Sequence, residues 1–242
     1  MTKTKEFPDK WQSDSLTKFI DVAIDNIVAT FYRDKNECPV LIEIDNIFQS
    51  IATALDHPGN KLVESMLLYR THSAFRASAM LAMSGMNPES FAQLRTCLEN
   101  ALYALHIHKN AGLDEIWLNR HIDEDSLKAV KNKFRISDTK KTLKDASTKH
   151  YEVASQLYER TIDFGAHPNE MATTSSLIIE EKDGNIKLQQ TYASGGNMQQ
   201  RHVMKSAAQV GVCSLFILRE IFKERFDILG LTAKLDVLSN DL

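Results

Sequence analysis

The run AAQVGVCSLFIL, from Ala207 to Leu218, decides how this chain folds. Apart from Gln209 and Ser214, its side chains are apolar or absent, so every side of a helix through it is apolar. A helix that is apolar all round lies in the interior of a protein. The run is much shorter than the roughly 20 residues that a helix needs to cross a bilayer. We therefore expect a buried helix, at about 198–226, in a protein that does not span a membrane.

The segments before this central helix have helical period as well. Apolar residues recur at steps of three and four, which predicts helices that each turn one apolar face to a common core. Pro88 suits the first turn of one of these helices. The expected helices cover about 16–31, 40–55, 61–85, 88–105, 113–121, 125–134 and 140–165.

One segment departs from helical period. Two β-prone runs, 176–181 and 186–192, flank an Asp183-Gly184 pair, and residues of these types tolerate the positive φ of a tight hairpin turn. We therefore expect an all-α protein, an up-and-down helical bundle of about six or seven helices, with a small β-hairpin insertion at about 176–192. Residues 1–13 are expected to form a disordered N-terminal tail and 14–242 a single helical-bundle domain.

Composition and cysteine usage narrow the class of protein. The net charge of −3 over 242 residues gives no overall attraction to nucleic acid or to a membrane. Cys38, Cys97 and Cys213 are odd in number and far apart, which argues against a disulfide scaffold and favours a reducing cytoplasm. Residues 1–11 are polar and no apolar stretch follows them, unlike a signal peptide. These features predict a soluble, cytoplasmic protein.

The sequence has no pattern typical of a metal or cofactor site. His106 and His108 are two residues apart and point to different sides of a helix, and no His-x-x-x-His or Glu-x-x-His spacing occurs. The glycine pair at Gly195 and Gly196 lacks the Lys-Ser/Thr of a phosphate-binding loop. We expect no metal and no cofactor.

Arg160 and His167 are the best candidates for a site. Gly165 and Pro168 indicate that the preceding helix ends near 165, so His167 would lie in a turn. A histidine there can act as a general base or acid near pH 7. An arginine can hold a phosphate through two parallel hydrogen bonds. The pair could therefore bind a phosphate and move a proton.

A structural interpretation of the same pair is equally open. Arg160 would then form an ion pair with Asp163 or Glu159 on a solvated face, and His167 would contact the last carbonyls of the helix. Under this interpretation neither residue has a role in chemistry.

The spacing of the pair resembles the motif of HEPN domains, in which Arg is followed after four to six residues by His near the junction of the last two helices of an α-bundle. Thr161 follows Arg160, where the family more often has Asn, His or Asp. The run from Arg95 to Glu99 resembles the Arg-x-x-x-Glu helix of uncharacterised bacterial HEPN-like proteins. The resemblance covers roughly residues 60–226.

This resemblance implies a metal-independent endoribonuclease of a defence or toxin system that acts on RNA as a homodimer. In that role His167 would take the proton from a ribose 2′-hydroxyl and Arg160 would hold the scissile phosphate, both as catalytic residues. Other HEPN domains have lost catalysis, so the alternative is a helical binding or assembly module without enzymatic activity.

Two further groups of polar residues are candidates. Arg95 and Glu99 are i,i+4 neighbours beside an apolar stripe, and Arg70 shares a row with apolar residues of the preceding helix, so we expect the three to form a buried polar centre. The window 128–144 has a local net charge of +6, which suits a phosphate backbone but also a solvated helical face. The phosphate or RNA contacts expected in this window are Lys131, Lys133, Arg135, Lys140 and Lys141.

Overall fold

The fold is all-α with one small β-hairpin, as the sequence predicts. The structure is a computed structural model that describes residues 7–55, 59–168, 170–182 and 184–240. Its elements in chain order are helices α1 (Ser15–Arg33), α2 (Glu37–Thr53), α3 (Leu62–Ser84), α4 (Asn87–Lys109), α5 (Leu113–Leu118), α6 (Glu124–Lys133), α7 (Ile136–Ala146) and α8 (Thr148–Thr161), the π-helical turn η1 (Ile162–Ala166), helix α9 (Glu170–Thr174), strands β1 (Leu177–Lys182) and β2 (Asn185–Gln190), and helices α10 (Met198–Ile228) and α11 (Leu231–Asn240).

The apolar run at 207–218 lies at the centre of the bundle. Helix α10, which contains it, packs against α2, α3, α4, α8 and α11. Gly211 allows α10 to approach α2 and α3 closely, because a Cβ there would lie 2.7 Å from the Phe75 ring and 2.8 Å from a methyl carbon of Ile44. The expectation of a buried central helix is thus confirmed.

The helix expected at about 140–165 is two α-helices followed by a wider, π-helical segment. The Ser147 side chain accepts a hydrogen bond from the His150 N–H and so caps the start of α8, which separates α8 from α7. Beyond Thr161 the helix widens into η1, and Gly165 has non-helical dihedral angles. The prediction of a single long helix was wrong, because the apolar pattern carries no information about the Ser147 cap.

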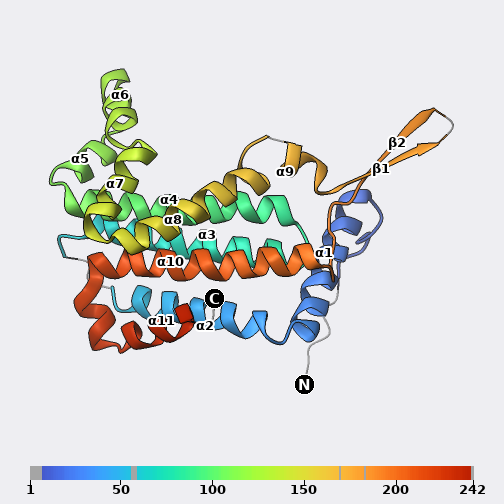
Figure 1. Cartoon of the computed structure of the whole chain (residues 1–242), viewed down its shortest axis with the longest axis horizontal. Coiled ribbons are helices and arrows are strands. Elements are labelled where there is room, and N and C mark those ends of the chain that lie inside the picture. The colour runs from blue at the N-terminus through green and yellow to red at the C-terminus, as the bar shows by residue number, and fades with distance from the viewer. Residues whose placement is uncertain (1–6, 56–58, 169, 183, 241–242) are drawn as a thin grey trace.

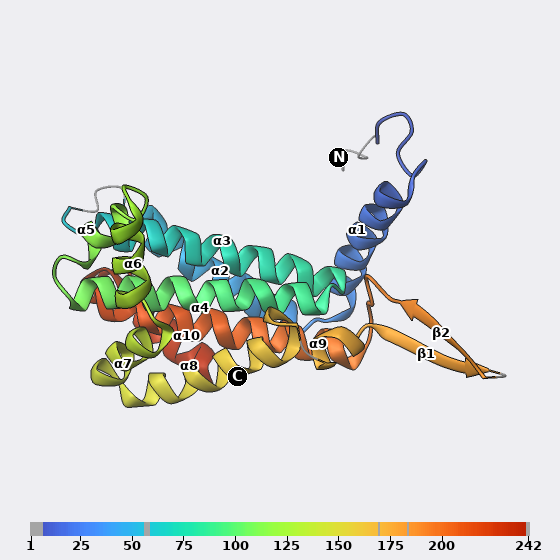
Figure 2. The same ribbon diagram turned by 90° about the horizontal axis from the view of Figure 1, so that it is seen from above.

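The long helices run side by side, α11 folds back along α10 and α2, and most of the other short elements gather at the two ends of the bundle (Figure 1). One end, which we call the hairpin end, carries α1 and the β1–β2 hairpin. Both project away from the bundle in diverging directions (Figure 2). The other end, the α6 end, carries α5, α6 and α7. Among the residues described, no helix has an apolar stretch long enough to cross a bilayer.

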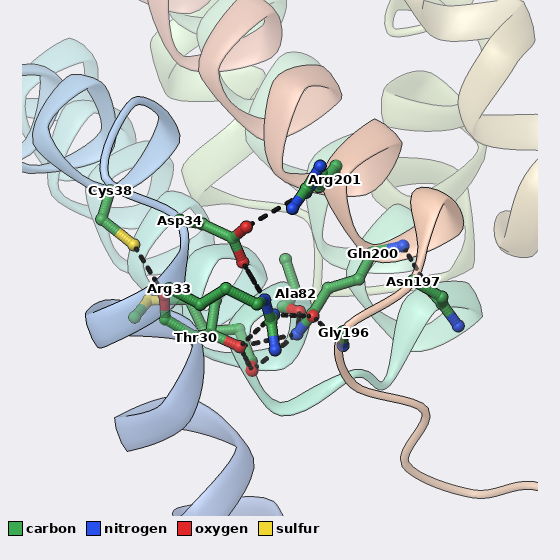
Figure 3. A network of polar contacts seen from close by, with 10 residues as sticks. Thr30, Arg33, Asp34, Cys38, Ala82, Gly196, Asn197, Gln200 and Arg201 are labelled. Atoms are coloured by element: carbon green, nitrogen blue, oxygen red, sulfur yellow. Dashed lines mark hydrogen bonds and ion pairs between the residues drawn. The ribbon is translucent and has the colours of Figure 1, made fainter.

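A buried polar network joins α1 and α3 to the start of α10 (Figure 3). Gln200 is fully buried, and its Nε2 donates to Thr30 Oγ1 at 3.0 Å and to the Met83 carbonyl at 2.8 Å. Its Oε1 accepts from Arg33 Nη2 at 2.7 Å. The network holds the base of α1 while the rest of that helix projects.

The side chain of Asp34 is almost fully buried beside this network. Burial alone would raise its pKa, but the hydrogen bonds and charges of Arg33 and Arg201 outweigh burial and hold the pKa below the ordinary value. The carboxylate therefore stays charged at neutral pH and ties α10 to the end of α1.

Residues 7–13, which we expected to be part of a disordered tail, form turns that return to α1. Trp11 Nε1 donates to Asp21 at 3.0 Å, and the Phe7 and Trp11 rings stack at 5.0 Å. The rest of the expected tail, 1–6, lies outside the described residues.

Candidate functional site

Arg160 lies in the last turn of α8, half-buried against α10. Its Nη1 donates to Gln209 Oε1 at 2.6 Å and to Ser206 Oγ at 3.4 Å. The structural interpretation had given Arg160 an ion pair with Asp163 or Glu159, and Glu159 pairs with Lys140 at 3.2 Å. Contact between α8 and α10 therefore fixes the direction of the guanidinium.

His167 is exposed in a bend that follows η1. The π-helical turn interrupts the α-helical period that would have placed Arg160 and His167 on one face. In the part of the chain that the structure describes, no hydrogen bond or ring contact joins the two side chains. Arg160 faces α10, whereas His167 faces solvent.

The imidazole that Arg160 does influence is His202 on α10. Burial lowers the pKa of His202, and the nearby Arg160 charge lowers it further, so the ring is neutral at pH 7. We did not predict this residue. The sequence does contain a signal for it. His202, Ser206 and Gln209 recur at steps of four and three, which places them in a polar row on one side of a mostly apolar helix.

His202 is part of a small aromatic cluster. The Phe91 and Phe164 rings stack at 5.3 Å, and His202 lies 5.6 Å from Phe164 and 6.3 Å from Phe91. Phe164 belongs to η1, so this turn packs its aromatic side chain onto α4. The cluster joins α4, η1 and α10 at one point.

A cavity of about 600 Å³ opens beside this cluster, at the hairpin end. Its walls come from the first turn of α4, from η1, from the base of the hairpin and from the first turns of α10. Gly165 brings η1 against the start of α4, because a Cβ at Gly165 would lie 2.1 Å from the Pro88 carbonyl oxygen. The residues that line it include Asn87, Glu89, Phe91, Phe164 and His202.

Arg95 and Glu99 form an ion pair on α4, but both side chains are partly exposed, so the centre is not buried as expected. Arg95 Nε lies 2.8 Å from Glu99 Oε1, and the Tyr158 hydroxyl donates to the same oxygen at 3.0 Å. Burial and the Glu99 charge raise the pKa of Tyr158 to about 12. Lys140 lies 4.2 Å from the centre of the Tyr158 ring and pairs with Glu159. The centre is a structural joint between α4, α7 and α8.

Arg70 does not belong to this centre, so that part of the expectation was wrong. The residue is exposed on α3, because the buried arc of that helix is narrower than its apolar pattern suggests. The nearby buried positions Leu67 and Thr71 face the core, and Arg70 falls just outside the arc.

The expected basic contacts lie mainly on α6 and α7. Four of the five side chains are exposed. The fifth, Lys140, is only 14% exposed and pairs with Glu159. These helices form the α6 end, whereas α8 runs toward the opposite end of the bundle before reaching η1 (Figure 1). The structure therefore separates the basic window from His167. The exposed members are Lys131, Lys133, Arg135 and Lys141.

The described residues contain no group of three or more His, Cys, Asp or Glu side chains that could hold a metal ion. Cys38, Cys97 and Cys213 are buried and unpaired. Burial raises the pKa of both Cys97 and Cys213 to about 12, so neither is a reactive thiolate near neutral pH.

These features define an all-α bundle with a projecting hairpin and a cavity at the same end. No protein-family model, curated protein or solved structure matches the chain. What the protein does has to follow from the chemistry of its own residues.

Proposed function

We propose that the protein is a non-catalytic helical assembly module that forms a homodimer through its hairpin end. The observation that carries this proposal is uncovered apolar surface. In α1, all of whose residues are described, Thr30 alone is buried, although the helix has a long apolar stripe. Leu16 is 64% exposed and Phe31 49%. A helix with such a stripe gains little from folding unless another surface covers it.

The hairpin has an uncovered apolar face of its own. The strand register pairs Ile179 with Leu188 and Glu181 with Ile186, which places both pairs on the same face. Ile179, Ile186 and Leu188 are exposed by 59%, 69% and 61%. An isolated two-stranded hairpin is only marginally stable in water, so a projecting hairpin with an apolar face requires a partner.

A second copy of the chain is the partner that fits both surfaces. The helix face and the strand face belong to one protomer and project from the same end, so a two-fold axis lets each hairpin lie on the α1 of the other protomer. A specific interface buries about 800 Å² per partner, and each large aromatic contributes roughly 150–250 Å² when buried. Phe31, Tyr32 and Tyr192 are all at least 49% exposed at this end and would supply much of that area.

Replacing Ile186 and Leu188 together by aspartate is expected to convert the dimer to monomers. The two carboxylates would be buried without partners in the interface, and a central contact is worth about 2 kcal/mol or more, so the dimer dissociation constant should rise at least about 100-fold. Sedimentation or light scattering across a concentration series measures this constant directly.

The matched control is Ile122→Asp at the α6 end. Ile122 is 70% exposed, so this variant adds a charge at an equally exposed position away from the proposed interface. It should dimerise like the wild type. A wild-type protein that stays monomeric at high micromolar concentration contradicts the proposal, as does a doubly substituted variant that dimerises normally with native helix content.

The second candidate function is a metal-independent endoribonuclease. One observation favours it. Gly165, which lies between Arg160 and His167 in the chain, packs against Pro88 at the start of α4, so this segment is near the hairpin end, where the proposed dimer would bring two copies together. Gln209 holds one end of the Arg160 guanidinium, which leaves the side chain oriented and partly exposed for an anion. His167 is free to approach an RNA from solvent.

Under this second function, Arg160→Ala and His167→Ala should each lower RNA cleavage in the presence of EDTA at least about 100-fold, since each removes phosphate binding or proton transfer. Arg70→Ala and His121→Ala, at exposed positions outside the pair, should cleave at the wild-type rate. Absence of cleavage by the wild type over several RNAs, or equal rates in all variants, removes the nuclease and leaves the assembly proposal intact.

A further inference from the structure

Both outer edges of the β1–β2 hairpin are open. The two strands pair with each other without a bulge, and no third strand joins them in the part of the chain that the structure describes. Each outer edge therefore carries backbone N–H and C=O groups that another strand can bond to. Added strands would turn a marginally stable hairpin into a sheet of a size that is stable in water.

The hydrogen bonds of the hairpin show which residues of β2 face its open edge. In an antiparallel pair, residues bonded across the pair alternate with residues whose backbone groups point outward. The Thr191 N–H donates to the Ser176 carbonyl at 2.8 Å, so every second residue from Thr191 along β2 is bonded within the hairpin. The residues between them direct their N–H and C=O groups to the open edge, and on β2 these are Ile186, Leu188 and Gln190.

The same three residues form one face of β2, because side chains alternate between the two faces of a strand. Ile186 and Leu188 are its exposed apolar residues. If the β2 strand of a second copy pairs antiparallel with this edge, outward-facing residues must align with outward-facing residues. The apolar faces of the two hairpins then become continuous. The edge of β2 is therefore self-complementary, as an interface on a two-fold axis requires.

Charge selects one register for this self-pairing. A two-fold axis at Lys187 would place two ammonium groups directly opposite each other, which is destabilising. An axis at Leu188 places Lys187 opposite the neutral amide of Gln189 in the other copy. It also aligns Ile179, Leu188 and their two copies in one apolar row across the sheet, since Ile179 pairs with Leu188 within each hairpin.

Charge also selects β2 over β1 as the strand at the axis. Glu181 of β1 lies opposite Ile186, on the apolar face of the hairpin. If two β1 strands met, Glu181 would lie on an inner strand, and its carboxylate would lose water under the covered face without gaining a cation. When two β2 strands meet, Glu181 lies on an outer strand, where its side chain reaches solvent.

We propose that two copies of β2 pair antiparallel across the two-fold axis, centred on Leu188, and join the two hairpins into one four-stranded sheet. This inference rests on the dimer proposed above and specifies the part of the partner that the strand edge binds. Backbone hydrogen bonds set the register, and the continuous apolar face of the sheet is covered by the α1 helices.

Disulfide formation between Lys187→Cys and Gln189→Cys, two variants mixed in equal amounts, tests the register. Directly opposite residues of this type have Cα atoms about 4.5 Å apart, within the disulfide range, whereas the two copies of either residue lie roughly 7–8 Å apart. The mixed disulfide should therefore exceed either symmetric one at least about tenfold. Cys38, Cys97 and Cys213 are buried and do not compete.

The matched control is a mixture of Ile178→Cys and Glu180→Cys, which tests the edge of β1 in the same way and should give little disulfide. More disulfide from this mixture than from the β2 mixture would place β1 at the axis. A symmetric Lys187→Cys disulfide in excess would move the axis to Lys187. Either result, or equal yields of all the disulfides, overturns the proposal.

Gln190→Pro tests the strand edge without cysteines. The Gln190 N–H points away from β1 and would donate to the Ile186 carbonyl of the other copy, so proline removes this bond twice per dimer and leaves the hairpin paired. Its dimer dissociation constant should exceed that of Gln190→Ala at least about tenfold. Equal constants show that this edge is unpaired and overturn the inference while the dimer stands. A wild-type protein that stays monomeric contradicts the proposed function, and this inference with it.

Discussion

Replacement of Gln200 by leucine is expected to lower the free energy of unfolding by about 3 kcal/mol, which corresponds to a fall in melting temperature of roughly 6–12 °C. Leucine nearly preserves the side-chain volume, so the loss comes from polar groups that stay buried. The Gly196 N–H, 2.8 Å from Gln200 Oε1, loses that acceptor, and the Ala82 carbonyl loses a donor at 3.1 Å. Arg33 keeps its contacts with Asp34 but loses its link to α10.

Gln199→Leu is the matched control for this prediction. Gln199 is the preceding residue on α10 but is exposed, so its replacement should change the free energy of unfolding by less than about 0.5 kcal/mol. Equilibrium unfolding in urea measures both variants. A loss below about 1 kcal/mol in Gln200→Leu would mean that water replaces the amide at little cost, and that α1 is held mainly by other contacts.

The architecture was predictable because its signals are periodic and local. The apolar run at 207–218 predicts a central helix from its composition alone, and Asp183-Gly184 between β-prone runs predicts a hairpin. The break at Ser147 was missed because one serine can cap a helix or lie within one, and only its hydrogen bond to the His150 N–H separates the two cases.

The candidate site was less predictable because its contacts join distant parts of the chain. Sequence spacing relates Arg160 to His167, but packing of α8 on α10 directs Arg160 to Gln209 and brings it near His202. The cavity has no local signal at all, since its walls come from four separate segments. The expected burial of Arg70 failed for a similar reason. How much of the circumference of α3 is buried depends on how many helices pack around it, which the sequence of α3 does not reveal.

Gly165→Ala should have a comparably large effect through a different mechanism. The added Cβ would lie 2.1 Å from the carbonyl oxygen of Pro88 and under 3 Å from two of its carbon atoms. These are backbone atoms on α4, so no side chain can rotate away and η1 must move. We expect a loss of about 3 kcal/mol in the free energy of unfolding. Because η1 carries Phe164 into the cavity wall, that part of the wall should move with it.

Gly230→Ala separates this contact from the general cost of replacing a glycine. Gly230 has φ of +64° with no atom within 4 Å of an added Cβ, so its replacement brings backbone strain of about 1 kcal/mol without a clash. Gly165 has φ of 171°, an extended value open to any residue, so its replacement brings the clash without that strain. Thermal unfolding of both variants distinguishes the two causes. A Gly165→Ala protein as stable as the wild type would mean that η1 does not rest on α4, and the cavity wall would then have to be assigned to other contacts.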